Sequence, residues 1–143
     1  MYGVNGAPIR PYPLDPNAPF EERSKENALV ELPLSVFHPR FRLPVAGGFY
    51  ARLLPTWLLK RGIRNLNARG YPATIYFHPW EFNPAVATTT APVYKRFVSF
   101  YGIPQLKAKL EALLDTFEFT TADAIAREYE HPGVMTTQIG DER

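Results

Sequence analysis

Apolar residues recur at two different spacings along this 143-residue chain, and the spacing predicts where its helices and strands lie. Pro55 suits the first position of a helix, and Gly70 is well placed as the cap of its C-terminus. Between these two residues the apolar positions follow a roughly helical spacing: Trp57, Leu58, Ile63 and Leu66. A second amphipathic helix has an apolar stripe of Leu106, Leu110, Leu113 and Leu114, with charged residues away from it at Lys107, Lys109, Glu111 and Asp115.

Three short runs predict strands between these helices. Residues 28–33 form the first run, which Pro33 ends. Residues 73–77 form a β-branched and aromatic run that ends at His78 and is expected to be buried on both faces. Residues 117–119 could form a third strand before a last helix that Thr121 or Thr120 caps. The order strand, helix, strand, helix, strand, helix predicts an α/β fold with mostly parallel strands.

The pattern divides the chain into three parts. Residues 1–27 contain five prolines and predict a long extended N-terminal arm, and residues 131–143 predict a flexible polar tail. Residues 28–130 predict one α/β domain between them. Three short strands make a poor free-standing parallel sheet, because such sheets need both faces covered and their edges protected. We therefore expect the last portion of a larger α/β fold, or a homo-oligomer that covers the exposed edge.

Composition and charge narrow the classes of function. The net charge is +2, and the basic residues concentrated in 40–69 predict a solvated helix face rather than a nucleic-acid site, because no recognition motif accompanies them. The chain contains no cysteine, which excludes disulfides and thiolate metal sites. No apolar run approaches the length of a membrane span, and residues 1–27 do not resemble a signal peptide. A soluble, cytoplasmic protein without a membrane span or a nucleic-acid partner is expected.

His78, in the run Tyr76-Phe-His-Pro-Trp-Glu81, is the principal candidate for chemistry. The end of a parallel strand is where α/β folds place their sites, and imidazole exchanges protons near neutral pH. Trp80 could wall a pocket or stack on a sugar ring, and Glu81 could orient the imidazole or titrate on its own. The alternative is a histidine packed in an aromatic core with one backbone partner. The pattern alone leaves both interpretations open.

Other candidate residues surround this run. Arg52 follows Gly47-Gly48 and could form an ion pair with Glu81 or Glu31, or bind an anionic or hydroxyl-rich substrate. Exposed members of the dense aromatic set, such as Tyr50 and Tyr76, could form a sugar-stacking surface. Metal chemistry has little support, because the three histidines, His38, His78 and His131, lie far apart in the sequence. There is also no adjacent aspartate pair, phosphate loop or dinucleotide fingerprint.

An ordered set of motifs resembles the C-terminal region of bacterial polysaccharide deacetylases. The motifs are residues 29–33 (LVELP), 43–55 (LPVAGGFYARLLP), 70–72 (GYP) and 76–81 (YFHPWE), and the resemblance covers about residues 1–127. More narrowly, they are similar to the subgroup associated with exopolysaccharide export, whose C-terminal extension is often catalogued as a domain of unknown function. As an ordered set these motifs are fairly specific, although each is weak alone.

The resemblance implies a fold and a chemistry. It implies a partial (β/α)-barrel-like unit of about three short strands and three helices, from enzymes that hydrolyse N-acetyl or O-acetyl groups on polysaccharides. In a complete enzyme of this kind an Asp and two His hold zinc or another divalent metal, and a neighbouring Asp is the base. His78 matches the general acid of the family's last motif, and Tyr76 falls where an apolar residue lines the acetyl pocket. Tyr50, Arg52, Trp80 and Glu81 complete the expected polysaccharide-binding set.

The chain departs from the family pattern because it lacks the metal-binding and base motifs. A general acid contributes about 10²–10⁴-fold in an assembled site and nothing without a nucleophile to assist. We therefore expect no cofactor in this chain and no catalysis by it alone, with an upstream catalytic half as a partner. The alternative is a glycan-binding or assembly module without catalysis.

Overall fold

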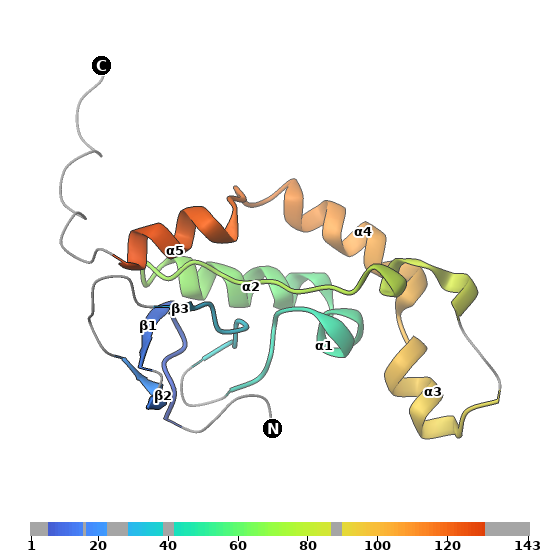
Figure 1. The fold of residues 1–143 in the computed structure, drawn as a ribbon. Helices are drawn as coiled ribbons and strands as arrows, with labels where there is room; N and C mark the ends of the chain where they lie inside the picture. The colour runs from blue at the N-terminus through green and yellow to red at the C-terminus, as the bar shows by residue number, and fades with distance from the viewer. Residues whose placement is uncertain (1–5, 16, 23–28, 39–41, 87–89, 131–143) are drawn as a thin grey trace, which may run out of the picture. The chain divides into compact units, whose positions relative to one another are not determined.

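The computed structural model describes residues 6–15, 17–22, 29–38, 42–86 and 90–130, which fall into two compact units (Figure 1). One unit spans Leu34–Phe119 and contains His78. The other combines Gly3–Pro33 with Thr120–Arg143. The mixed α/β class predicted from the sequence is confirmed. The predicted flexible tail, residues 131–143, lies outside the described residues.

The N-terminal segment supplies the sheet. Strands β1 (Tyr12–Asp15), β2 (Ala18–Glu22) and β3 (Val30–Glu31) pair in the order β2-β1-β3. Both pairs are antiparallel, so the predicted parallel orientation is wrong for this sheet. The reason is the tight turn after Asp15, whose Oδ1 accepts the Asn17 backbone N–H at 3.0 Å and folds part of the predicted extended arm into a hairpin. Helix α5 (Ala122–Glu130) completes this unit.

Helices dominate the other unit. They are α1 (Gly48–Leu53), α2 (Thr56–Asn67), α3 (Val93–Phe100) and α4 (Ile103–Leu114), with 3₁₀ turns η1 (Pro79–Phe82) and η2 (Pro84–Val86). The predicted helices correspond to α2, α4 and α5. Gly70 has a φ of +73° just beyond α2, and the next N–H returns to the Leu66 carbonyl, which confirms the predicted glycine cap. The Thr121 hydroxyl accepts the Ala124 N–H at 3.2 Å at the start of α5.

The predicted strand 73–77 runs extended past α2 but belongs to no sheet among the described residues (Figure 1). Its hydrogen bonds to the preceding chain are made by Thr74, whose N–H donates to Ser35 Oγ at 2.8 Å and whose carbonyl accepts the Ser35 N–H at 3.3 Å. Residues 117–119 form no strand either, and they turn after α4. Both segments have the composition of strands, but the structure supplies no neighbouring strand for either.

The hydrophobic core of this unit lies between its helices and the extended segment. Its buried members are Val45, Ala51, Leu59, Ile63, Leu106 and Leu113. Ala73, Ile75 and Phe77 pack against this cluster from one face of the extended segment. None of the helices in the described residues is long and apolar enough to cross a membrane.

Candidate functional site

His78 ends the extended segment and begins the 3₁₀ turn η1. Its backbone is still extended, with φ of −89° and ψ of 141°, and Pro79 then starts the turn with the fixed φ that proline supplies. Alternate residues of an extended chain point to opposite faces, so Phe77 enters the core while His78 is exposed. The imidazole is therefore exposed to solvent at the end of the segment. The alternative interpretation, a histidine packed in an aromatic core, is wrong.

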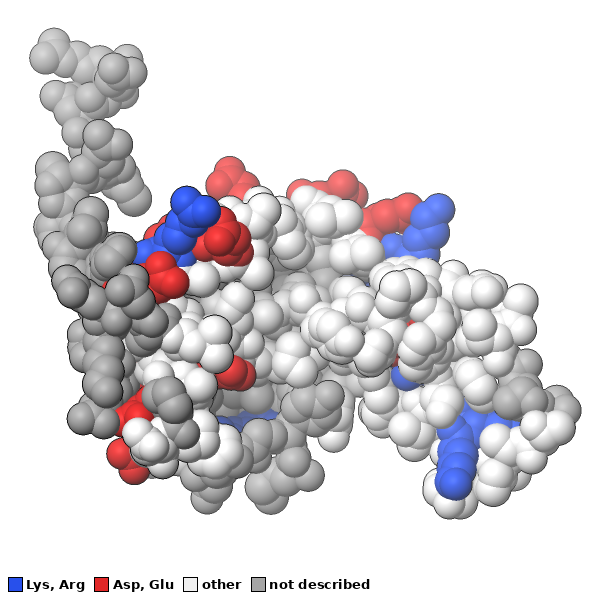
Figure 2. All heavy atoms as spheres, in the orientation of Figure 1, with Lys and Arg blue, Asp and Glu red and all other residues white. Residues whose placement is uncertain are grey.

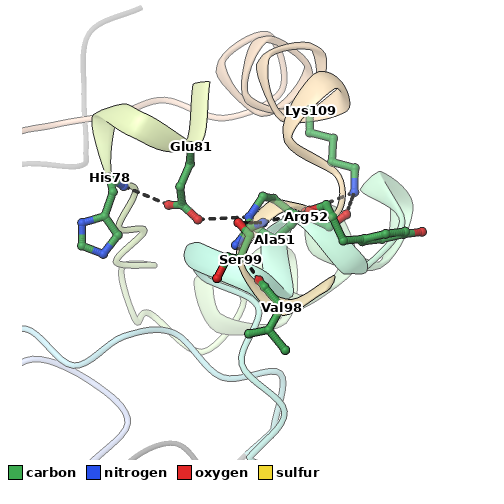
Figure 3. Close-up of polar contacts among 8 residues, drawn as sticks. Ala51, Arg52, His78, Glu81, Val98, Ser99 and Lys109 are labelled. Atoms are coloured by element: carbon green, nitrogen blue, oxygen red, sulfur yellow. Dashed lines mark hydrogen bonds and ion pairs between the residues drawn. The ribbon is translucent and has the colours of Figure 1, made fainter. Parts of the chain in front are cut away.

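Glu81 fixes the backbone of His78 rather than its ring. One carboxylate oxygen, Oε2, accepts the His78 backbone N–H at 2.9 Å, and the Glu81 N–H donates to the His78 carbonyl at 3.0 Å (Figure 3). These reciprocal bonds close the turn around Pro79 and Trp80. Glu81 is only 1% exposed, so its charge needs a partner inside the protein.

Arg52 is that partner. Its Nε donates to Glu81 Oε1 at 3.1 Å, and the ion pair is buried, with the two side chains 3% and 1% exposed. Its terminal nitrogens donate to three carbonyls at the C-terminal end of α3, those of Val98, Ser99 and Tyr101, at 2.7–3.1 Å (Figure 3). The carbonyls at the C-terminal end of a helix lack intrahelical partners. The Arg52 guanidinium supplies donors to them and at the same time neutralises the Glu81 carboxylate. The ion pair between Arg52 and Glu81 is confirmed.

Lys109, from α4, binds the backbone at the C-terminal end of α1. Its ammonium donates to the carbonyls of Ala51, Arg52 and Leu54 at 2.6–3.1 Å, which are the free acceptors at the end of that short helix. Burial lowers the pKa of the Lys109 amine from its ordinary value of 10.5. The predicted position of Lys109, away from the apolar stripe of α4, is wrong, because its ammonium reaches the carbonyls of α1. Its spacing of three residues after Leu106 and four before Leu113 could have placed it on their face.

Two glycines allow these elements to approach each other. Gly47 has a φ of +74°, and a Cβ there would lie 1.7 Å from the Tyr76 carbonyl oxygen. Gly102 has a φ of +75°, and a Cβ there would lie 2.8 Å from the Arg52 carbonyl oxygen. Only glycine fits such close contacts at positive φ. Gly47 thus sets α1 beside the residues that precede His78.

Two aromatic rings of the exposed face, those of Tyr76 and Trp80, flank the imidazole. The Tyr76 hydroxyl lies 3.1 Å from His78 Nδ1, and their ring centroids are 4.7 Å apart. Trp80 stacks near His78 at an interplanar angle of 20°, and the Arg52 guanidinium carbon lies 5.7 Å from the Trp80 ring centroid. Tyr76 is 50% and Trp80 39% exposed. The rings therefore form a partly open aromatic surface around a histidine.

The arrangement does not fit a metal ion. In the part of the chain that the structure describes, no three His, Asp or Glu side chains lie close enough together to hold one. The carboxylate nearest to His78, that of Glu81, is committed to Arg52 and to a backbone N–H. The chemistry that this group of described residues offers is proton exchange at the imidazole and contact with the aromatic rings.

A family model described as Domain of unknown function (DUF3473) matches residues 1–127. The chain belongs to this family. The match covers the extended segment, His78 and every helix of the unit that contains it. Comparisons with curated proteins and with solved structures found no match.

This DUF3473 chain brings together five of the six residues singled out in its sequence. His78, Tyr76, Trp80, Glu81 and Arg52 form one connected group, as the preceding contacts show. Tyr50 instead packs its ring against Phe49, at 5.8 Å between centroids. Direct substrate contact by Arg52 and Glu81 stays a prediction, and both side chains are buried and paired in the folded unit. The α3 carbonyls that bind Arg52 carry no signal in the sequence, because any residue type supplies a carbonyl.

Proposed function

We propose that this chain is the C-terminal segment of a polysaccharide deacetylase, in which His78 protonates the leaving group as an N-acetyl or O-acetyl bond is hydrolysed. The observation that carries the proposal is the presentation of His78. Its imidazole is exposed while its backbone is held through the buried pair of Glu81 and Arg52. A general acid needs an accessible ring on a rigid support, and both conditions are met here.

The Tyr76 hydroxyl suits a ring that gains and loses a proton. A hydroxyl both donates and accepts hydrogen bonds, so at 3.1 Å it can donate to Nδ1 of the neutral ring or accept from the protonated one. When it donates to Nδ1, the proton of the neutral imidazole resides on Nε2. We therefore assign Tyr76 a positioning role that persists through both protonation states of His78.

The proposal assigns only the proton transfer to this chain. No three His, Asp or Glu side chains among the residues that the structure describes could together hold a metal ion, and the sequence contains no adjacent aspartate pair that could match the family's base motif. A proton donor without an activated nucleophile does not cleave an amide or ester bond. The chain alone is therefore catalytically silent, and the remaining groups come from an upstream catalytic half.

Acetate release tests this function. The 143-residue chain and a version extended by the upstream coding sequence are each incubated with N-acetylated chito-oligosaccharides. We expect acetate only from the extended protein, and we expect His78→Ala to lower its kcat by about 10²–10⁴-fold. Tyr94→Phe, on the exposed surface of α3, serves as the matched control and keeps full activity.

The leaving group distinguishes proton donation from a structural role. In 4-nitrophenyl acetate the leaving group is 4-nitrophenolate, which departs without protonation. The His78→Ala enzyme should therefore hydrolyse this ester at a rate close to that of the unsubstituted enzyme. Equal losses on both substrates would assign His78 a structural role. Acetate release by the 143-residue chain alone would contradict the claim that it is silent.

The exposed rings support a second candidate, a glycan-binding module without catalysis. Tyr76 and Trp80 are accessible enough to stack on a sugar face, an arrangement in which aromatic rings bind hydroxyl-rich ligands. Calorimetry of the 143-residue chain with the same chito-oligosaccharides would then show binding that Trp80→Ala and Tyr76→Ala weaken. If no chito-oligosaccharide produces heat and the extended protein releases acetate, the results favour the deacetylase function over the glycan-binding module.

A further inference from the structure

The extended segment before His78 presents two different edges. In an extended chain the N–H and C=O of one residue point to one side, and those of the next residue point to the other. The Thr74 N–H and C=O both bind Ser35, and the Tyr76 carbonyl faces Gly47 so closely that no Cβ fits there. The edge defined by Thr74 and Tyr76 is therefore covered by the chain itself.

The opposite edge consists of the backbone groups of Ala73, Ile75 and Phe77. These residues make no backbone hydrogen bond to any residue that the structure describes, although their side chains pack on the core. They supply three N–H and three C=O groups in a row, at the spacing of about 6.8 Å that a β-ladder uses. We call this row the open edge. A row of unpaired backbone N–H and C=O groups is a ready template for pairing with another strand.

The open edge also lacks the features that protect edges from pairing. Residues 71–80 contain no charged side chain, whereas natural edge strands are commonly blocked by lysine or other charges. Uncharged side chains, drawn white, cover most of the middle of the face shown in Figure 2. Tyr76 and Trp80 extend the apolar surface beyond the edge itself. A row of backbone groups within an apolar surface fits an extended strand of a folded domain better than a glycan or a helix.

We infer that the open edge of residues 73–77 binds a β-strand of the catalytic half. This inference rests on the proposed function, which requires that half to reach His78. Paired strands lie 4.7–4.9 Å apart, so strand pairing at residues 73–77 brings the partner's chain beside the end of the segment, where His78 is exposed. Strand pairing would thus make residues 73–77 part of a sheet and complete the site in one step.

Amide hydrogen exchange tests the inference at single residues. The ¹⁵N-labelled 143-residue chain and the protein extended by the upstream coding sequence are compared by NMR. In the chain alone, exchanged in solution dilute enough to keep it monomeric, the amides of Ala73, Ile75 and Phe77 should exchange fast, and in the extended protein they should slow by about 10²-fold or more. The Thr74 amide, already bound to Ser35, is the internal control and should change much less.

Exchange and acetate release separate the two proposals. Slow exchange at the three amides without acetate release would support strand pairing and contradict the proposed deacetylase function. Fast exchange at the three amides in an extended protein that releases acetate would overturn the strand pairing and leave the function intact. Protection in the extended protein that disappears on dilution, together with dissociation of a dimer, would identify a second copy as the occupant and would also overturn the inference.

Discussion

At the scale of single residues, the buried pair of Arg52 and Glu81 links His78 to the packing of the helices. The substitution Arg52→Met keeps an apolar stem but removes every donor, so it leaves the Glu81 carboxylate charged and buried without its partner. We expect the free energy of unfolding to fall by about 3–5 kcal/mol, the usual cost of breaking a buried pair from one side. Urea denaturation followed by tryptophan fluorescence measures this loss.

A surface pair provides the matched control for Arg52→Met. Lys107 and Glu111 lie 3.7 Å apart on α4, and their side chains are 79% and 59% exposed. Lys107→Met should change the unfolding free energy by less than about 1 kcal/mol, because solvent and salt screen exposed pairs. Similar losses in the two variants would mean that the Arg52 pair contributes no more than a surface contact.

Tyr12 makes the stability of the sheet dependent on pH. Burial, with a smaller contribution from the Glu31 carboxylate, raises the pKa of the Tyr12 hydroxyl above its ordinary value of 10.0. Its hydroxyl donates to the Pro19 carbonyl at 2.9 Å, a bond that only the neutral form makes. The stabilisation is therefore complete below pH 10.0 and is lost as the pH rises through the folded-state pKa.

Comparison with Tyr12→Phe isolates this effect. The difference in unfolding free energy between the two proteins should be constant below about pH 10 and should shrink at higher pH, where the unsubstituted protein must ionise a buried group. Denaturation series at about pH 8–12 measure the difference. A difference that stays constant over the whole range would show that Tyr12 ionises as easily in the folded protein as in the unfolded chain.

The sequence predicts the members of the site better than their roles. His78, Trp80 and Glu81 share one short run, so their proximity follows from the sequence, and the pairing of Arg52 with Glu81 was one of two possibilities. The turn geometry could not be predicted, because it depends on Glu81 accepting the His78 backbone N–H instead of a ring N–H. Interactions with backbone carbonyls, such as those of α3, leave no mark on side-chain patterns.

At the scale of elements, Gly47 determines how closely α1 approaches the extended segment. Gly47→Ala would place a Cβ 1.7 Å from the Tyr76 carbonyl oxygen and would also strain a φ of +74°. Gly70→Ala strains a nearly equal φ of +73° in open space, so it is the matched control. We expect about 1–2 kcal/mol of destabilisation for Gly70→Ala and at least about 2 kcal/mol more for Gly47→Ala.

Thermal or urea unfolding compares the two glycine variants, and acetate release by the extended protein adds a functional readout. Gly47→Ala should lower activity as well as stability, because it displaces the segment that carries His78. Equal effects of the two substitutions would show that the chain shifts at little cost and that the close approach of α1 is unimportant.

The helices α2, α4 and α5 were predictable because their spacing and caps are local signals. The partners of residues 73–77 were not, since strand composition does not specify which strand lies beside it.

At the scale of the whole molecule, the open edge predicts how the chain behaves without a partner. Unpaired, uncharged strand edges bind one another, so the 143-residue chain alone should self-associate in the micromolar range. Sedimentation velocity over a series of concentrations measures this association. The upstream catalytic half competes for the same edge, so the extended protein should remain monomeric at the same concentrations.

A charge beside the open edge should prevent this association without unfolding the protein. Tyr76 is 50% exposed and points away from the core, so Tyr76→Lys introduces an ammonium next to the edge, as natural edge strands do. Tyr94→Lys adds the same charge to the exposed surface of α3 and is the matched control. We expect Tyr76→Lys to be monomeric and Tyr94→Lys to associate as the unsubstituted chain does. If the unsubstituted chain is itself a monomer at every concentration, its unpaired backbone groups are satisfied by water, and the edge does not drive assembly.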